Sequence, residues 1–352
     1  MLKKNKILNI AIIIIIFLLL IFINNNLDHY KIRILNLCAI YAILGLSMNL
    51  INGFTGLFSL GHAGFIAVGA YTTALLTMSS KVKNQNFFME ALISPLNHIS
   101  IPFLPALIIA GIISAILAFL IAAPALRLKG DYLAISTLGF AEIIRIVLTN
   151  LQSVTNGALG LRGIPNTTNL YWSFGIAIFT IIVIVSLINS SFGRALKAIR
   201  EDSVAAESMG INLFKHKTIA FTLGAFFAGV GGGLLGNLLG TIDPSMFKFV
   251  LTFNILLIVV IGGMGSITGS VISAFAVTIL SEFLRFLDME KEFGIGFIKF
   301  QGIPGLRMVV FSVLLMIIVL FFRNGIMGTK EFSWKAAFGI FNKKPLEQGG
   351  KN

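Results

Sequence analysis

Long apolar runs with few charged residues recur along the whole chain, and they set the strongest limit on its fold. Most of them extend for roughly 17 to 22 residues, about the length that a helix needs to cross ~30 Å of hydrocarbon. Only 12% of the residues are charged, whereas a soluble domain has about a quarter. The sequence therefore predicts an all-α integral membrane protein, a polytopic helical bundle with about ten transmembrane helices. These helices are expected over residues 7–23, 34–51, 61–79, 102–123, 131–149, 172–188, 218–239, 249–262, 268–284 and 306–322.

The segments between the runs are short, and none is long enough to fold as an independent domain. We divide the chain into an N-terminal membrane helix with a short loop (1–33), a membrane core (34–325) and a basic tail (326–352). No small-residue cleavage pattern follows the first run, so we predict an uncleaved helix instead of a signal peptide. The net charge of +13 comes from Lys and Arg placed mainly between the runs, as in loops near anionic headgroups. Their distribution predicts that both termini are cytoplasmic.

Two glycine-rich segments interrupt the apolar pattern, one at 52–65 and the other at 262–269. Glycine lets a helix break or lets two helices approach closely, and a broken helix needs protein or a water-lined cavity to cover its backbone. A pair of interruptions in the two halves of a chain indicates a transport site, with tight helix packing as the alternative. The candidate residues for a translocation path in these segments are Asn52, Gly53, Gly56, Ser59, Gly61, His62, Gly263 and Gly265.

Opposite charges lie three residues apart at Glu142 and Arg145, on one face of a predicted helix. Each ion alone in lipid would cost a few kcal/mol, so the two are expected to pair and to face the bundle or a vestibule. The pair is a further part of the candidate path. The sequence allows two roles for this ion pair: it can support the structure or contact a substrate.

The motifs of common catalytic sites are missing: there is no phosphate-binding loop, no H-E-x-x-H zinc pair and no nucleophile elbow. The four histidines are far apart and Cys38 is the single cysteine, so we predict no metal site and no directly bound cofactor. A transport subunit without enzymatic activity of its own fits this pattern, and its energy has to come from a partner or an ion gradient.

The longest internal loop covers about residues 189–217 and is rich in alanine and charged residues. It predicts one or two short helices interrupted at Gly210. Such a segment can dock in a groove of a partner or lie on the membrane.

Five ordered segments together resemble the permease subunits of branched-chain amino-acid ABC importers, of the LivM type. They are residues 53–71, 130–145, 156–165, 192–212 and 260–269. The resemblance implies a permease core at 34–325 that forms a path with a sister permease of the LivH type in the bacterial cytoplasmic (inner) membrane. It also implies two cytoplasmic ATPase subunits, which use the ATP, and a periplasmic or lipid-anchored substrate-binding protein. The resembling segments add Tyr132, Asn156 and Gly157 to the candidate path.

In such importers a cytoplasmic loop with the pattern E-A-A-x-x-x-G inserts into the ATPase. Ala205, Ala206 and Gly210 fit this pattern, but Val204 replaces the leading glutamate, and Glu201 lies one helical turn before Ala205. The resemblance implies that the ATPase coupling loop includes Arg194, Arg200, Glu201, Ala205, Ala206 and Gly210.

Two alternatives to an amino-acid importer stay open at this point. A urea importer permease of the same superfamily would look alike in sequence. A secondary transporter driven by ions would need intramembrane carboxylates, and only Glu142 is well placed, with Glu282 nearer a helix end. For an amino-acid substrate, the two charges of the zwitterion need partners of both signs, which Glu142 and Arg145 would supply.

Overall fold

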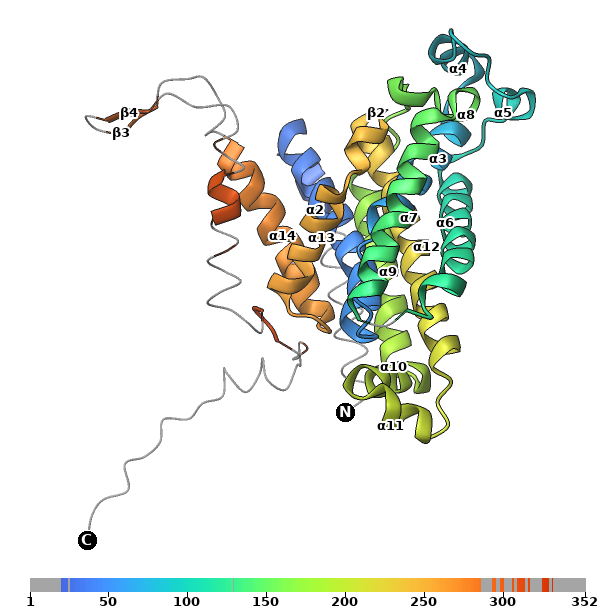
Figure 1. Cartoon of the computed structure of the whole chain (residues 1–352). Coiled ribbons are helices and arrows are strands. Elements are labelled where there is room, and N and C mark those ends of the chain that lie inside the picture. The colour runs from blue at the N-terminus through green and yellow to red at the C-terminus, as the bar shows by residue number, and fades with distance from the viewer. Residues whose placement is uncertain are drawn as a thin grey trace.

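A computed structural model describes residues 20–24, 26–128, 130–285, 293–295, 298–300, 306, 309–313, 316, 325–328 and 331 of the chain. Within them, the long helices run side by side as a bundle (Figure 1). Five helical segments of the described part are long and apolar enough to cross a membrane. They are α2 with its extension η1 (His29–Phe54), α6 (Phe103–Ala125), α7 (Asp131–Asn150), α9 (Leu170–Asn189) and α12 (Leu213–Leu239).

Three shorter apolar helices complete the described bundle: α3 (His62–Thr77), α13 (Phe249–Gly262) and α14 (Ile267–Phe283). All spans predicted between residues 34 and 284 are therefore helical. The predicted spans 7–23 and 306–322 and the tail 326–352 lie largely outside the described residues. The number of about ten transmembrane helices therefore stays a prediction, and so do the boundaries between the three parts of the chain.

Two helices begin earlier than the apolar pattern predicts. α2 begins at His29 instead of residue 34, and α12 begins at Leu213 instead of residue 218. In α12 the side chain of Asn212 accepts a hydrogen bond from the amide of Lys215 and caps the helix. Polar helix ends can extend past the hydrocarbon layer, so the apolar run marks only the part of a helix in the membrane.

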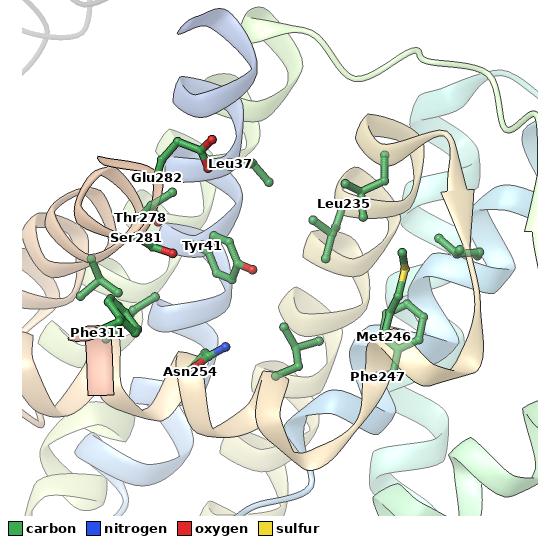
Figure 2. Close-up of a pocket in the computed structure, with 15 residues that line it drawn as sticks. Leu37, Tyr41, Leu235, Met246, Phe247, Asn254, Thr278, Ser281, Glu282 and Phe311 are labelled. Carbon is green, nitrogen blue, oxygen red and sulfur yellow. The ribbon is translucent and has the colours of Figure 1, made fainter. Parts of the chain in front are cut away.

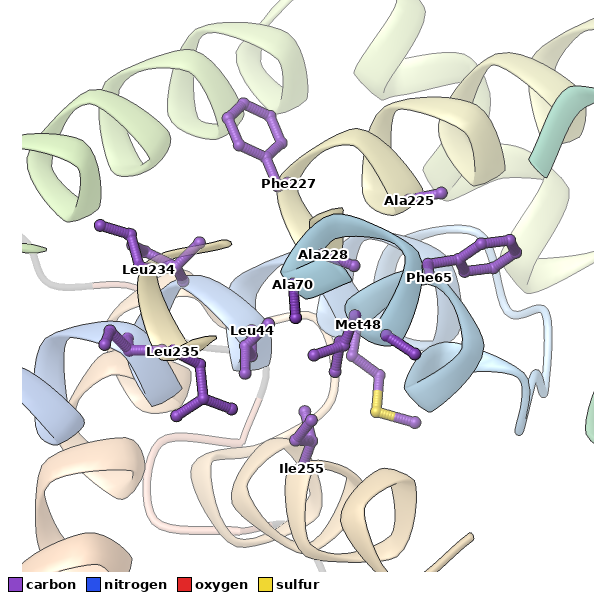
Figure 3. Close-up of a cluster of buried hydrophobic side chains, with 14 of the residues drawn as sticks. Leu44, Met48, Phe65, Ala70, Ala225, Phe227, Ala228, Leu234, Leu235 and Ile255 are labelled. Atoms are coloured by element: carbon purple, nitrogen blue, oxygen red, sulfur yellow. The ribbon is translucent and has the colours of Figure 1, made fainter. Parts of the chain in front are cut away.

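The centre of the bundle is α12, which packs mainly against α3 and α6 and also contacts α2. Its glycines permit this close approach. A Cβ atom on Gly232 would lie 2.1 Å from the carbonyl oxygen of Ile66 in α3, and a Cβ atom on Gly69 would lie 2.0 Å from that of Gly229. Apolar side chains such as Leu44, Phe65 and Leu234 fill the space around this contact (Figure 3). The helices are thus held by backbone proximity, as is common within membranes.

Substitution of Gly69 by Ala is expected to lower the free energy of unfolding by about 2 kcal/mol, because the added methyl group forces α3 and α12 apart. The measurement is thermal unfolding of the purified chain in detergent. Gly175→Ala in α9 is the matched control, since a Cβ atom there meets nothing within 4 Å. Equal destabilisation by both substitutions would contradict the role of close α3–α12 packing.

Short elements cover the two ends of the bundle (Figure 1). One end carries α4 (Ser80–Asn86), α5 (Ser94–His98), α8 (Gln152–Thr155), η2 (Gly157–Leu159) and the antiparallel pair β1 (Leu161–Arg162) and β2 (Thr241–Ile242), followed by η3 (Pro244–Phe247). The opposite end carries α10 (Ser191–Glu201) and α11 (Ser203–Ser208). The described residues also include the hairpin of β3 (Phe293–Ile295) and β4 (Ile298–Phe300).

A buried lysine holds the end that carries α4 and α5. The Lys83 ammonium donates hydrogen bonds to the carbonyl oxygens of Leu96, at 2.7 Å, and Ile99, at 2.6 Å. Removal from water lowers the pKa of Lys83. The two hydrogen bonds tie α4 to the segment that leads into α6.

Candidate functional site

The first glycine-rich segment is a real interruption of the helical path. α2 widens into the π-helical turn η1 (Leu50–Phe54), and the chain then leaves the helix at Gly56, which has a positive φ of 68°. α3 begins only at His62. The Asn52 side chain spans the intervening loop, because its amide nitrogen donates to the carbonyl oxygen of Ser59 at 3.1 Å.

The second glycine-rich segment separates α13 from α14. Gly263 and Gly265 have φ values of 105° and 87°, a backbone conformation that favours glycine. The two helix ends lie against each other, since a Cβ atom on Gly262 would be 2.5 Å from the carbonyl carbon of Gly269. Both predicted interruptions are therefore present.

The two interruptions meet at the buried side chain of Asn49, the last residue of α2. Its Oδ1 accepts a hydrogen bond from the amide of Gly265 at 2.8 Å, and its Nδ2 donates to the Ser266 carbonyl and the Ser270 hydroxyl, both at 2.8 Å. A Cβ atom on Gly53 would lie 2.5 Å from the Gly265 nitrogen. Asn49 is not among the residues predicted from the sequence, although an amide side chain late in an apolar span needs hydrogen-bond partners and is therefore a signal.

The internal loop forms two helices, α10 and α11, as predicted. The break between them lies at Asp202 and not at Gly210. The chain changes direction at Asp202, whose carboxylate accepts hydrogen bonds from the amides of Val204 and Ala205 and caps α11. Gly210, with a φ of 82°, instead ends the second helix. Aspartate is a strong N-cap, which explains why the break falls at residue 202.

One face of α11 is open to solvent. Val204 and Met209 are 72% and 82% exposed, and Ala205 is exposed beside them, whereas Ala206 packs inward. Arg194, on the first turns of α10, is exposed and reaches the Asn189 carbonyl at 3.5 Å.

Arg200 joins this loop to both glycine-rich interruptions. Its Nη1 donates to the carbonyl oxygen of Gly53 at 2.9 Å, and its Nε lies 3.6 Å from a carboxylate oxygen of Glu201. A Cβ atom on Gly265 would lie 2.3 Å from Nη1 of Arg200, and one on Gly56 would lie 3.2 Å from its Cγ. Three glycines thus form a cradle for one arginine side chain, and this side chain connects α10 to both interruptions.

The ion pair in α7 forms as the spacing predicts. Nε of Arg145 lies 2.6 Å from Oε2 of Glu142, and the two side chains are 26% and 36% exposed. Glu142 also lines a small crevice with Ala63 of α3 and Thr252 of α13. The pair therefore lies where α3, α7 and α13 meet, and its two side chains are partly exposed on the surface of the chain.

The other candidate path residues are spread along the described part of the molecule. Tyr132 is 73% exposed on the first turn of α7. His62 is buried and its Nε2 lies 2.8 Å from the Ser47 hydroxyl, and a Cβ atom on Gly61 would meet the Thr137 carbonyl of α7 at 2.7 Å. Asn156 and Gly157 form a left-handed turn after α7, at the end opposite α10. The first interruption thus touches α7, but Gly53, Gly56 and Gly265 lie at the α10 end.

A separate cavity of about 400 Å³ lies between α2, α12, α13 and α14 (Figure 2). Its lining is mainly apolar, with Leu37, Tyr41 and Phe247 among its residues. The Glu282 carboxylate at its edge accepts hydrogen bonds from Tyr30 and Arg285. None of the candidate path residues lines this cavity. In the described part of the chain, no group of three His, Cys, Asp or Glu side chains could hold a metal ion.

The fold and these contacts define a multi-pass helical membrane protein with an exposed helical loop anchored on two broken helices. The chain belongs to the family described as branched-chain amino acid transport system / permease component, whose model matches residues 30–322. The family is one of transport permease subunits.

Curated relatives agree with this family. The chain is 35% identical to the high-affinity branched-chain amino acid transport system permease protein LivM of Salmonella typhimurium, over 72% of this chain and 64% of that protein. It thus spans less than two thirds of the length of that relative. It is 26% identical to the probable LivM of Methanocaldococcus jannaschii, over 89% of this chain and 96% of that protein. It is also 24% identical to LivH of Escherichia coli, over 83% and 92% of the two chains. No solved structure matches the chain.

Proposed function

We propose that this chain is a permease subunit of an ATP-driven importer for branched-chain or other small amino acids. The observation that carries the proposal is the contact of Arg200 with Gly53 and its packing against Gly265, which join a solvent-exposed loop to two interrupted membrane helices. A force applied to α10 and α11 by a nucleotide-driven partner would reach both interruptions directly. The chain binds no cofactor in this proposal, and ATP is used by partner subunits.

One of the two ATPase subunits of the importer would bind α10 and α11 from the cytoplasm, with the exposed Val204 and Met209 as apolar contacts. The opposite end, with α4, α5 and α8, would then face outward toward a periplasmic or lipid-anchored substrate-binding protein in a bacterial inner membrane. This orientation agrees with the excess of basic residues predicted for the cytoplasmic side.

A sister permease of the LivH type would cover the open face of α7. Tyr132, Ile135 and Ile143 on this helix are 73%, 66% and 55% exposed. The similarity of the chain to both LivM and LivH proteins supports a pair of related subunits. The Glu142–Arg145 pair on the same helix would then face the path between the two permeases and offer one charge of each sign to a zwitterionic substrate.

The test is uptake of radiolabelled leucine by cells that express the complete importer. We expect uptake to stop when ATP is depleted and to continue when an uncoupler removes the proton gradient. The reverse dependence would show an ion-coupled secondary transporter. Uptake of urea without uptake of any amino acid would show a urea permease instead.

Glu142→Gln and Arg145→Gln are each expected to reduce uptake about tenfold, the effect of ~1.4 kcal/mol, because each leaves an unpaired charge on the path. Asn150→Leu, at the exposed end of the same helix, is the matched control. Unchanged uptake of every amino acid by both charge variants would make the pair structural.

A further inference from the structure

The interruption between α13 and α14 leaves two sets of backbone groups without partners inside the helices. These are the last carbonyl groups of α13 and the first amide groups of α14. A short segment from far along the chain, residues 325–328, supplies partners for the first set. The amide of Ile326 donates to the carbonyl of Ile261 at 2.7 Å, and that of Met327 donates to Gly262 at 3.2 Å.

Glycines make this contact close. A Cβ atom on Gly263 would lie 2.4 Å from the carbonyl oxygen of Gly328, and one on Gly325 would lie 2.5 Å from the nitrogen of Gly263. Gly325 and Gly328 both have positive φ values, 71° and 59°. The turn is therefore shaped to lie on the interruption, and larger side chains at these positions would lift it away.

Glu331 supplies partners for the second set. One carboxylate oxygen accepts from the amide of Ile267 at 2.6 Å, and the other accepts from the amide and hydroxyl of Thr268 at 3.1 and 2.9 Å. The next amide, of Gly269, donates to the Ser266 hydroxyl at 3.0 Å. A carboxylate at this position also complements the positive end of the helix dipole. All three leading amides of α14 are satisfied, two of them by Glu331.

The same interruption also lies against Arg200 of α10. Glu331, Gly265 and Thr268 line a cavity of about 610 Å³ together with Lys197 and Arg200 of α10. Gly265 is the residue that leaves room for the Arg200 guanidinium. It lies between the two helix ends that residues 325–328 and Glu331 contact. The two attachments therefore share one backbone loop.

We propose that residues 325–328 together with Glu331 form a brace that fixes the α13–α14 interruption in the geometry that receives Arg200, with Glu331 as a positioning residue. The brace acts through Gly265 and contacts no transported molecule. Its effect on coupling rests on the proposed importer function, whereas its effect on the helix ends does not.

The test compares hydrogen exchange of the purified full-length chain with transport by the complete importer. Loss of a helix cap raises local opening about fivefold, so Glu331→Ala should speed exchange at the amides of Ile267 and Thr268 by about this factor. Glu331→Gln keeps one carbonyl oxygen and should give a smaller increase. In the assembled importer, Glu331→Ala should lower the amount of amino acid moved per ATP hydrolysed.

Glu90→Ala is the matched control, because Glu90 is exposed near α4 at the other end of the molecule. Unchanged exchange at residues 267–268 in Glu331→Ala would overturn the brace. Faster exchange with an unaltered transport-to-hydrolysis ratio would overturn the positioning role. An unmodified importer that moves no amino acid would count against the proposed function alone, since the exchange result stands without it.

Discussion

Leucine uptake by an importer that carries Arg200→Glu is expected to fall about 100-fold, the effect of ~2.7 kcal/mol. The substitution removes the hydrogen bond from Arg200 to the Gly53 carbonyl and puts a carboxylate among acceptor oxygens. A charge-assisted hydrogen bond contributes about 1.5–3 kcal/mol, and an unpaired charge at this partly buried position adds to the loss. Hydrolysis of ATP by the partner subunits should continue without uptake, because the loop no longer moves the two interruptions together. The measurement is uptake and hydrolysis in the same membrane vesicles.

The control for this variant is Arg127→Glu, the same charge reversal at an exposed position after α6. It changes the charge of a loop on the same predicted side without touching the glycine cradle, so uptake should stay near that of the unmodified importer. Arg200→Lys should fall between the two, because it keeps the charge and loses the planar donor geometry. Coupled turnover in Arg200→Glu would show that α10 transmits its movement by another contact.

The second large effect is expected for Asn49→Leu, which should lower the free energy of unfolding by about 3 kcal/mol or more. Leucine has a similar volume but cannot accept from the Gly265 amide or donate to the Ser266 carbonyl. The buried Gly265 amide therefore loses its acceptor, whereas the Ser266 carbonyl loses one of three donors. The Ser270 hydroxyl keeps its bond to the Ser266 carbonyl and adds little to the loss. Thermal unfolding in detergent measures this effect.

Asn150→Leu serves as the control here too, because that asparagine is exposed and bonds only within its own helix turn. Its unfolding temperature should change little. Equal stability of Asn49→Leu and the unmodified chain would show that the two interruptions hold together without this amide.

The helical content of the described bundle follows from the apolar pattern. Lipid offers no hydrogen-bond partners, so each long uncharged run must form its backbone hydrogen bonds within itself, as a helix does. The two interruptions were also predictable, because clustered glycines favour a break in a helix. The positive φ values at Gly56, Gly263 and Gly265 are conformations that favour glycine. The Glu142–Arg145 contact was also predictable, because spacing within one helix fixes it.

Contacts between distant segments could not be predicted in this way. Asn49 lies more than two hundred residues before its partners, and helical periodicity carries no information about which helix lies opposite. For the same reason Gly53 and Gly265 were predicted as parts of a translocation path across the membrane, but their common contact with Arg200 could not be predicted. The break between the helices of this loop was predicted at Gly210 because glycine is a strong helix-breaking signal in a sequence. In the structure the break falls at Asp202, whose side chain caps α11.

The acceptor for Arg200 is a main-chain oxygen, and this has a genetic consequence. A carbonyl group is the same for every amino acid, so no mutation of codon 53 can restore a lost contact by changing its chemistry. The positions beside it, 56 and 265, have backbone angles that other residues rarely adopt. Revertants of a defective Arg200 allele should therefore map to the α10–α11 segment itself or to the partner subunit that, in the proposed importer, would contact it.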